Sequence, residues 1–243
     1  MIIEGNVSVK AALLGHQREV LKLYADKDKH DRDLAFILHR AMDRNVPVEY
    51  LAREEIDAMA SGRTHGGLLA EVTPAKWQCL EDCREEVPFY ALVEGVEDPF
   101  NLGYVMRTLY SAGCTALLLR KRDWQKAEST IIKASAGASE YLNVILCEDL
   151  IEAVKTLKKE GVVCYAAMRR DAVVYHEADM TKPLLIAIGG EMRGLSAKLL
   201  KEIDQNIYIP YANDFRNALN AAAATAVLAF EVQRQRSLGK ESV

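Results

Sequence analysis

Short apolar segments alternate with amphipathic segments in the first third of the chain. This pattern predicts strands at 19–25, 46–51 and 66–72 and helices at 7–14, 31–45 and 53–61. In the second helix the apolar positions Leu34, Ile37, Leu38 and Ala41 share one face. Asn6 and Asp31 are placed to cap the first two helices, and Gly15 to end the first. The alternation predicts a small α/β domain.

The pattern changes between Pro74 and Pro88. This stretch, PAKWQCLEDCREEVP, is polar, prone to form a helix and bounded by prolines. We therefore expect a linker at 74–88 between a first domain at 1–73 and a second at 89–243.

A second alternating series follows the linker. Strands are predicted at 89–95, 115–119, 142–146, 162–168, 184–189 and 206–210, with helices at 101–113, 128–138, 148–160, 196–203 and from 215 onward. Short apolar strands between amphipathic helices indicate a mostly parallel sheet covered on both faces. Ligands bind such sheets beyond the carboxyl ends of the strands. The junctions at 95–107, 188–196 and 209–220 are therefore the candidate sites.

Each junction has an ordinary structural explanation when it is taken alone. Leu102, Val105, Met106 and Leu109 form the buried stripe of the first helix, which leaves Arg107 off the stripe and makes Asn101 a candidate cap. The glycines of AIGGEMRGLS fit neither a dinucleotide-binding nor a Walker loop, because the required spacing is missing. Asn217 or Asn220 can cap the last helix.

Composition and charge exclude several classes of protein. The net charge of -4 argues against a protein that coats nucleic acid indiscriminately, although a local basic patch remains compatible with it. Neither a long uncharged apolar run nor a secretory leader is present, so a cytoplasmic protein without membrane contact is expected. The five cysteines are dispersed and read as reduced thiols; Cys79 and Cys83 with His65 lack the further ligand of a zinc site, and no metal is expected.

Four segments together resemble the ordered motifs of the SpoU/TrmH branch of the SPOUT RNA methyltransferases. They are DPFNLGYVMRTLYSAG, KASAGASEYLNV, AIGGEMRGLS and IYIPYANDFRNALNAAAATAVLAFEV, and they span nearly all of 89–236. Residues 1–73 resemble the small L30e-like substrate-binding domain of many such enzymes. The resemblance implies an α/β fold with a C-terminal trefoil knot, an exception to the rule against threaded chains.

The resemblance also implies a reaction and its residues. Members transfer a methyl group from S-adenosylmethionine to a ribose 2'-hydroxyl of ribosomal or transfer RNA, and they are typically homodimers. By motif position, Gly189, Ile209 and Leu219 correspond to cofactor-binding points. The catalytic positions correspond to Arg107, Asn101, Glu191 and Asn220. An arginine is a poor base because it stays protonated, so we favour an electrostatic role for Arg107 in orienting the hydroxyl and phosphate.

RNA contacts are expected from scattered cations. The candidates are Arg53, Arg63 and His65 in the first domain, and Arg122 with its neighbours Arg120 and Lys121 in the second. The two-domain layout favours ribosomal over transfer RNA by analogy alone.

One position departs from the family pattern. The usual Ser-Leu-Asn of the third motif is Ala218-Leu219-Asn220 here, and the preceding loop is one residue longer. Asn217 is a candidate replacement for the serine. Three interpretations stay open: a ribose 2'-O-methyltransferase, a non-catalytic or altered-specificity RNA-binding relative, and an α/β enzyme that uses another nucleotide-like cofactor.

Overall fold

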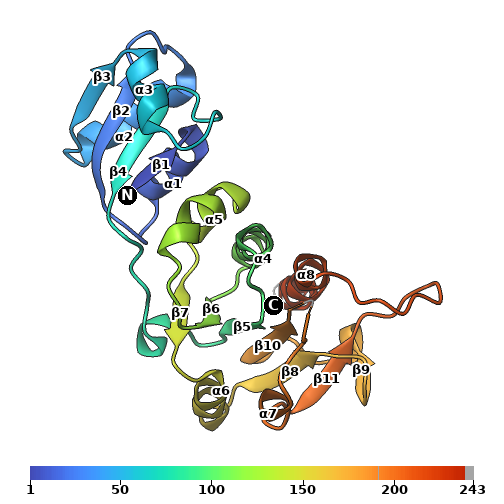
Figure 1. Ribbon diagram of the computed structural model, residues 1–243. Helices are drawn as coiled ribbons and strands as arrows, with labels where there is room; N and C mark the ends of the chain where they lie inside the picture. The colour runs from blue at the N-terminus through green and yellow to red at the C-terminus, as the bar shows by residue number, and fades with distance from the viewer. Residues whose placement is uncertain (191, 239–243) are drawn as a thin grey trace. The chain divides into compact units, whose positions relative to one another are not determined.

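The computed structural model describes residues 1–190 and 192–238, and the chain divides into two compact units (Figure 1). The first unit comprises Met1–Lys76 together with Trp124–Tyr141, and the second comprises Trp77–Asp123 together with the chain from Leu142 onward. The segment at 124–141, which the sequence pattern places in the second domain, thus belongs to the N-terminal unit.

A four-stranded sheet with the order β1-β4-β2-β3 forms the first unit. Its strands are β1 (Ile2–Glu4), β2 (Val20–Asp26), β3 (Val48–Leu51) and β4 (Leu68–Val72), and its α-helices are α1 (Asn6–Leu14), α2 (Arg32–Asp43), α3 (Arg53–Met59) and α5 (Glu128–Ala134). β2 and β3 run parallel, whereas β4 is antiparallel to both β1 and β2. The predicted strands and helices of this unit are confirmed, and β1 is an addition.

The helix caps of this unit agree with the sequence in part. The Asp31 carboxylate accepts a hydrogen bond from the Leu34 N–H at 2.7 Å, and Gly15 ends α1, both as predicted. The predicted Asn6 cap is wrong: Asn6 is the first residue of α1, and the preceding Gly5, at φ 86°, occupies the cap position without a side chain to donate or accept.

Residue 132 joins the core of the N-terminal unit from far along the chain. The core contains buried side chains of α1, α2, β2 and β4 together with Ile132 of α5. Gly137, at φ 83°, lies so close to α1 that an added Cβ would be 2.4 Å from the Ala11 Cβ. Segment 124–141 therefore completes this core.

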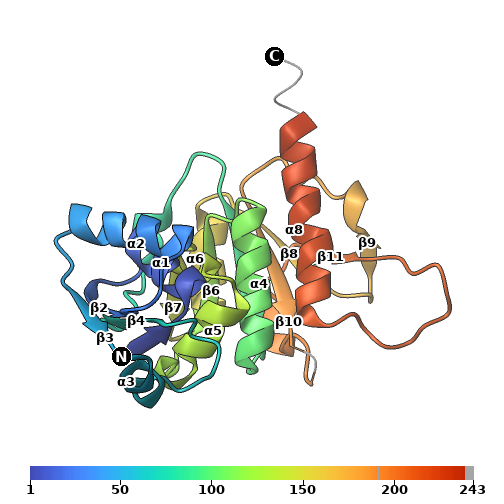
Figure 2. The ribbon, with the colours of Figure 1, turned by 90° about the horizontal axis from the view of Figure 1, so that it is seen from above.

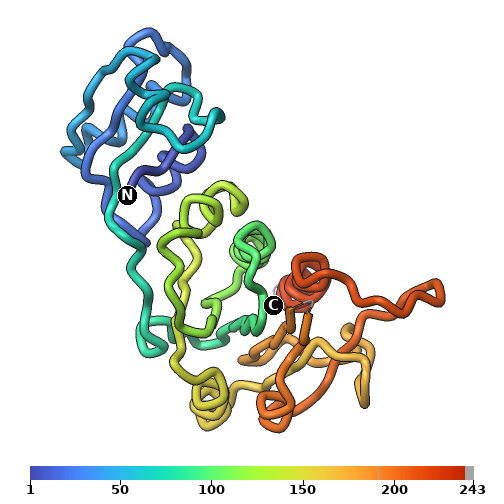
Figure 3. The backbone as a smooth tube through the Cα atoms, viewed as in Figure 1, coloured from blue at the N-terminus to red at the C-terminus, as the bar shows by residue number. Residues whose placement is uncertain are grey.

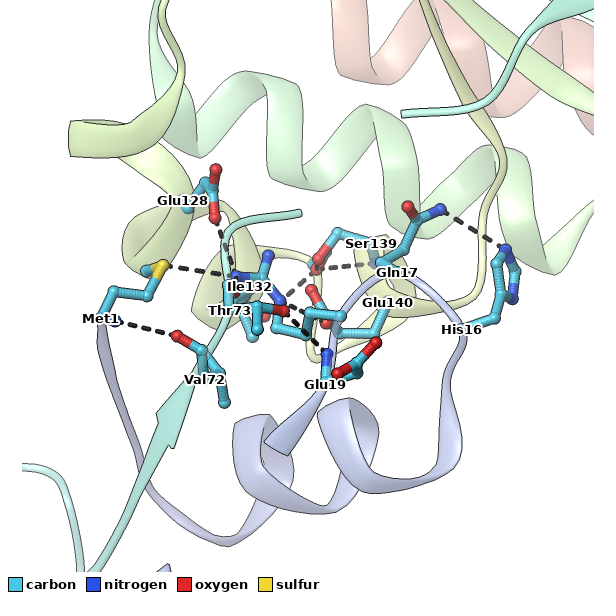
Figure 4. Close-up of polar contacts among 12 residues, drawn as sticks. Met1, His16, Gln17, Glu19, Val72, Thr73, Glu128, Ile132, Ser139 and Glu140 are labelled. Carbon is cyan, nitrogen blue, oxygen red and sulfur yellow. Dashed lines mark hydrogen bonds and ion pairs between the residues drawn. The ribbon is translucent and has the colours of Figure 1, made fainter. Parts of the chain in front are cut away.

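Buried charges connect the same segment to the start of β2. Arg18 donates to Glu128 Oε2 at 2.8 Å and to Glu140 Oε2 at 2.7 Å, and all three side chains are at most 5% exposed. Figure 4 shows Glu128 and Glu140 among the surrounding polar contacts. Burial raises the pKa of Glu140, against the lowering effect of Arg18.

A seven-stranded sheet with the order β7-β6-β5-β10-β8-β11-β9 forms the second unit. All six pairings are parallel, which confirms the predicted parallel sheet. The strands are β5 (Phe89–Glu94), β6 (Ala116–Arg120), β7 (Val144–Cys147), β8 (Val163–Ala167), β9 (Ala172–Val174), β10 (Leu184–Gly189) and β11 (Gln205–Tyr208). β9 was not predicted.

Helices cover both faces of this sheet, also as predicted. In Figure 1, α4 (Pro99–Ser111) and α8 (Ala221–Leu238) lie on one face, and α6 (Leu150–Lys159) and α7 (Ala197–Leu200) lie on the other. Figure 2 shows α4 and α8 side by side. The predicted linker at 74–88, although prone to form a helix, contains only a short 3-10 turn at Leu80–Cys83.

The path after β11 is long. A loop at 209–220 joins β11 to α8, which returns to pack on α4 and β10 (Figure 3). The predicted trefoil knot requires such a return and stays a prediction. Across the described residues, no helix combines the length and apolar character needed to cross a membrane.

Candidate functional site

The candidate site lies where several parallel strands of the second unit end. Because all its strands run in the same direction, the residues after β5, β8, β10 and β11 meet at one edge of the sheet. A cavity of about 360 Å³ opens there. Its lining residues come from the ends of β8, β10 and β11, from the loop at 209–220 and from α8.

The cavity brings the three predicted cofactor positions together. Gly189, Ile209 and Leu219 all line it, although thirty residues separate the first and last of them. Apolar side chains from three elements form its walls, among them Ile188, Ile207 and Leu228. The cavity therefore offers an apolar surface next to exposed loop backbone.

The glycines beside the cavity allow two backbones to meet. A Cβ on Gly190 would lie 2.1 Å from the Gly95 carbonyl oxygen, and the Gly190 N–H donates to the Glu94 carbonyl at 2.7 Å. A Cβ on Gly189 would lie 2.5 Å from the Gly194 carbonyl carbon. Glycine is thus required at 189 and 190 because the backbone of residues 95 and 194 leaves no room for a side chain there.

The first turn of α8 is capped by Asn220. Its Oδ1 accepts a hydrogen bond from the Ala223 N–H at 2.8 Å. Asn217 is exposed and lies before the helix, so it does not cap α8. Asn101 does not cap α4 either, because the Asp98 carboxylate occupies that position and accepts from the Asn101 N–H at 3.0 Å.

Arg107 lies outside the cavity of its own chain. The predicted stripe of α4 is confirmed, since Leu102, Val105, Met106 and Leu109 are buried, and Arg107 is exposed. Arg107 and the half-buried Asn101 are absent from the cavity lining among the described residues. The remaining predicted catalytic residue, Glu191, lies outside the described residues.

The predicted RNA-binding side chains occupy different environments. Arg53 donates to Asp57 at 2.8 Å and lies 3.5 Å from Asp26, with its side chain 48% exposed. His65 is buried, with Nε2 3.1 Å from Asp57 Oδ1 and Nδ1 accepting from the Gly67 N–H. Direct RNA contact by His65 does not fit this burial, because both ring nitrogens already contact Asp57 and Gly67.

Two further arginines remain accessible. Arg63 is exposed in the N-terminal unit. Arg122 is exposed in the second unit and donates to the Glu97 carbonyl at 3.0 Å. Both can present a cation to a phosphate.

The cysteines are unpaired and mostly buried. Burial raises the pKa of Cys83 and Cys147 to about 11, and that of Cys114 and Cys164 to about 12, so these thiols stay protonated at neutral pH. Over residues 1–190 and 192–238, no group of three or more His, Cys, Asp or Glu side chains is arranged to hold a metal ion.

The residues on the β8 side of the cavity were not among the predicted site residues. Arg169 follows β8, lines the cavity, and places its guanidinium carbon 4.0 Å from the centre of the Tyr211 ring. Arg193, Arg216 and Tyr211 line the cavity as well. The rule that pointed to the other strand ends applies equally to residues 169 and 170, directly after the predicted apolar strand at 162–168.

Comparisons with known proteins match both parts of the chain. The sequence profile described as "SpoU rRNA Methylase family" matches residues 88–230, and the one described as "RNA 2'-O ribose methyltransferase substrate binding" matches residues 2–78. A 23S rRNA (guanosine-2'-O-)-methyltransferase, RlmB of Pseudomonas putida, is 30% identical over 243 residues and covers 97% of both chains. RlmB of Photobacterium profundum is 29% identical over 98% of both.

Solved structures agree at the level of the fold. The SpoU methyltransferase AviRb of Streptomyces viridochromogenes has a TM-score of 0.82 at 20% identity, over 98% of this chain and 90% of its own. An AdoMet-bound rRNA methyltransferase of Sinorhizobium meliloti has a TM-score of 0.79 at 22% identity, over 96% and 86%. The profile matches, the full-length relatives and the parallel sheet thus agree, and the chain belongs to the SpoU rRNA methylase family.

Proposed function

We propose that this chain transfers a methyl group from S-adenosylmethionine to a ribose 2'-hydroxyl of ribosomal RNA. The observation that carries the proposal is the single cavity lined by Gly189, Ile209 and Leu219 at the carboxyl edge of the sheet. The RlmB relatives, named for guanosine in 23S rRNA, support ribosomal RNA and make guanosine the first nucleotide to test.

The cavity suits the proposed cofactor. Its volume falls within the range of about 300–1,000 Å³ that is usual for small-molecule sites, and its apolar walls can enclose an adenine ring. Backbone groups of Gly189, Ile209 and Leu219 would hold the nucleoside, while Ile188, Ile207 and Leu228 exclude water. When bound, S-adenosylmethionine supplies an electrophilic methyl group on a sulfonium.

Arg107 is proposed to act on the RNA side of the reaction. Its guanidinium can hold the phosphate next to the target ribose and orient the 2'-hydroxyl, with Asn101 assisting. Glu191 is proposed to position this group. Asn220 is proposed to act through the helix start, because its side-chain oxygen already caps α8.

A second copy of the chain is proposed to complete the site. Phe100 and Tyr104 lie on the same face of α4 as Arg107 and are 53% and 47% exposed. Exposed aromatic side chains around an arginine are typical of interface hot spots. A homodimer that covers this face would bring Arg107 of one copy to the cavity of the other. Such a partner is needed because Arg107 does not line the cavity of its own chain.

Isothermal titration with S-adenosylmethionine, followed by mapping of ribosomal 2'-O-methyl groups in cells without the protein, tests the proposal. We expect heat of binding and one lost modification, restored by the wild-type gene. No binding contradicts the proposal. Binding without any lost modification favours the non-catalytic relative, for which the observation is Ala218 in place of the usual serine. A lost modification in transfer RNA would redirect the substrate.

The composite site is tested with two variants that fail for different reasons. Arg107→Ala should abolish transfer and keep cofactor affinity, whereas Leu219→Trp should fill the cavity and keep Arg107. Coexpressed, the two should regain about a quarter of wild-type activity, because half the dimers are mixed and each has one intact site. No regained activity, with mixed dimers shown by mass spectrometry, contradicts a shared site.

A further inference from the structure

The loop at 209–220 forms one side of the cavity but has little support of its own. Residues Ala212–Asn220 are exposed, and Figures 1 and 2 show the loop projecting from the sheet and helices of its unit. Its Leu219 is nevertheless one of the residues that line the cavity. Something must therefore hold the loop if the cavity is to be formed before a ligand binds.

Arg169 supplies that support from outside the loop. Its Nη1 donates to the Phe215 carbonyl at 3.3 Å, and its guanidinium lies over the Tyr211 ring. Over the described residues, it is the one side chain outside 209–220 that donates a hydrogen bond to a group between 209 and 219. Arg169 follows directly after β8, so it connects the loop to a central strand of the sheet.

Tyr211 links Arg169 to Leu219, which lines the cavity. Its hydroxyl accepts a hydrogen bond from the Leu219 N–H at 2.8 Å, which closes the loop upon itself. The Phe215 ring lies 6.3 Å from the Tyr211 ring and adds a second contact within the loop. Arg169 thus acts on Leu219 through Tyr211, across one continuous set of contacts.

We infer that Arg169 and Tyr211 are positioning residues that hold the loop at 209–220 in its cofactor-binding form. The inference rests on the proposed function. A loop that is ordered beforehand loses less conformational freedom when the ligand binds, so the contacts raise affinity even though Arg169 need not touch the reacting atoms. Tyr211 lies in the loop that is one residue longer than the family pattern, and Arg169 holds this loop from outside.

A double-mutant cycle on cofactor affinity tests the inference. Arg169→Ala and Tyr211→Leu should each weaken S-adenosylmethionine binding about tenfold, and the double variant should also weaken it about tenfold, because both remove the same contact. In turnover, KM for the cofactor should rise while kcat changes little. Arg169→Lys, which keeps a cation over the ring, should restore part of the affinity.

The neighbouring Arg170→Ala is the matched control. It removes the same charge one residue away, from a side chain that is 85% exposed and lies 3.3 Å from Asp171. We expect wild-type affinity from it. An Arg169→Ala affinity equal to that of Arg170→Ala, or a double variant about a hundredfold weaker, would overturn the inference.

Amide hydrogen exchange without cofactor separates this inference from the proposed function. Exchange at the Leu219 N–H should be faster in Arg169→Ala and in Tyr211→Phe, which keeps the ring but lacks the acceptor, and unchanged in Arg170→Ala. Faster exchange supports the connection even if S-adenosylmethionine fails to bind the wild type. Unchanged exchange in Arg169→Ala overturns it even if the cofactor binds.

Discussion

At the scale of single residues, the asparagines before α8 illustrate what a sequence can and cannot assign. Both Asn217 and Asn220 were candidate caps, and the choice depended on where the helix begins. That start is set by the packing of Ala221 and Thr225 in the interior, which no local pattern encodes. Gly189, Ile209 and Leu219, which the family resemblance predicts to bind the cofactor, line one cavity because the parallel strands end at one edge, and their binding role stays a prediction. The placement of Arg107 outside that cavity depends on tertiary structure.

Asn220→Ala should destabilise the protein by about 1 kcal/mol, because the Ala223 N–H loses its acceptor. Asn217→Ala is the control and should leave the free energy of unfolding within about 0.5 kcal/mol of wild type. Urea denaturation measures both. Should Asn217→Ala nevertheless reduce methyl transfer, Asn217 would be the replacement for the missing serine.

Glu4 is expected to make the stability depend on acid pH. Burial acts to raise its pKa, but hydrogen bonds from Lys133 and Ser61 lower it to about 2. A depressed carboxyl pKa stabilises the fold above the ordinary value near 4.5, and this contribution is lost as the pH falls towards 2. Glu4→Gln should therefore lower the free energy of unfolding by about 3 kcal/mol at pH 7, and by progressively less below pH 4.5.

The control for Glu4 is Glu19→Gln. Glu19 also pairs with a lysine, Lys76, at 2.6 Å, but its side chain is 64% exposed. We expect a small and nearly pH-independent change from this variant. Equal effects of the two substitutions would contradict the assignment of the pH dependence to the buried hydrogen bonds that Glu4 accepts from Lys133 and Ser61.

Among the elements, periodicity predicted most strands and helices of the second unit. It failed for short segments whose structure depends on pairing with a neighbouring strand. Strands 89–95, 115–119 and 184–189 are apolar enough to be recognised alone. β9 and β1 have three residues each, and they are strands because β11 and β4 lie beside them. The stretch at 74–88 has helical propensity, but too few apolar positions are available to fix a helix, and only a short turn forms.

Arg236 anchors the last turn of α8 to neighbouring backbone. Arg236 donates to four backbone carbonyls, those of Val87, Pro88, Met180 and Lys182. Arg236→Ala removes the side-chain donor from all four carbonyls, of which Pro88 keeps the Leu184 N–H, and should lower the free energy of unfolding by about 2 kcal/mol. Gln233→Ala, on the same turn but bonded only to Ser237 among the described residues, should change it little. Thermal denaturation compares the two.

At the scale of the whole molecule, the connection between distant segments of the N-terminal unit is the feature that sequence alone did not show. Arg18 lies between Glu128 and Glu140, more than a hundred residues further along the chain. Nothing in the local pattern pairs these positions, because each reads as a surface charge. The predicted linker at 74–88 between two domains stays a prediction, and segment 124–141 packs with Met1–Lys76.

Arg18→Ala should destabilise the protein by about 3 kcal/mol at pH 7, because two buried carboxylates lose their cation. A raised carboxyl pKa favours the protonated folded form, so stability should rise again as the pH falls from 7 towards 5. Arg18→Ala with Glu140→Gln should recover part of the loss at pH 7. Denaturant unfolding across this pH range measures each step, and a pH-independent loss would contradict the explanation.

Segment 124–141 also determines how this protein can be recombined with its relatives. Exchanging only residues 1–76 for those of another methylase would leave Glu128, Ile132 and Glu140 of this chain in place. These side chains would then face a foreign core that lacks their original partners. A chimera designed to transfer RNA preference should therefore move both stretches together. Swaps that follow the order of the chain would break the very unit they are meant to transplant.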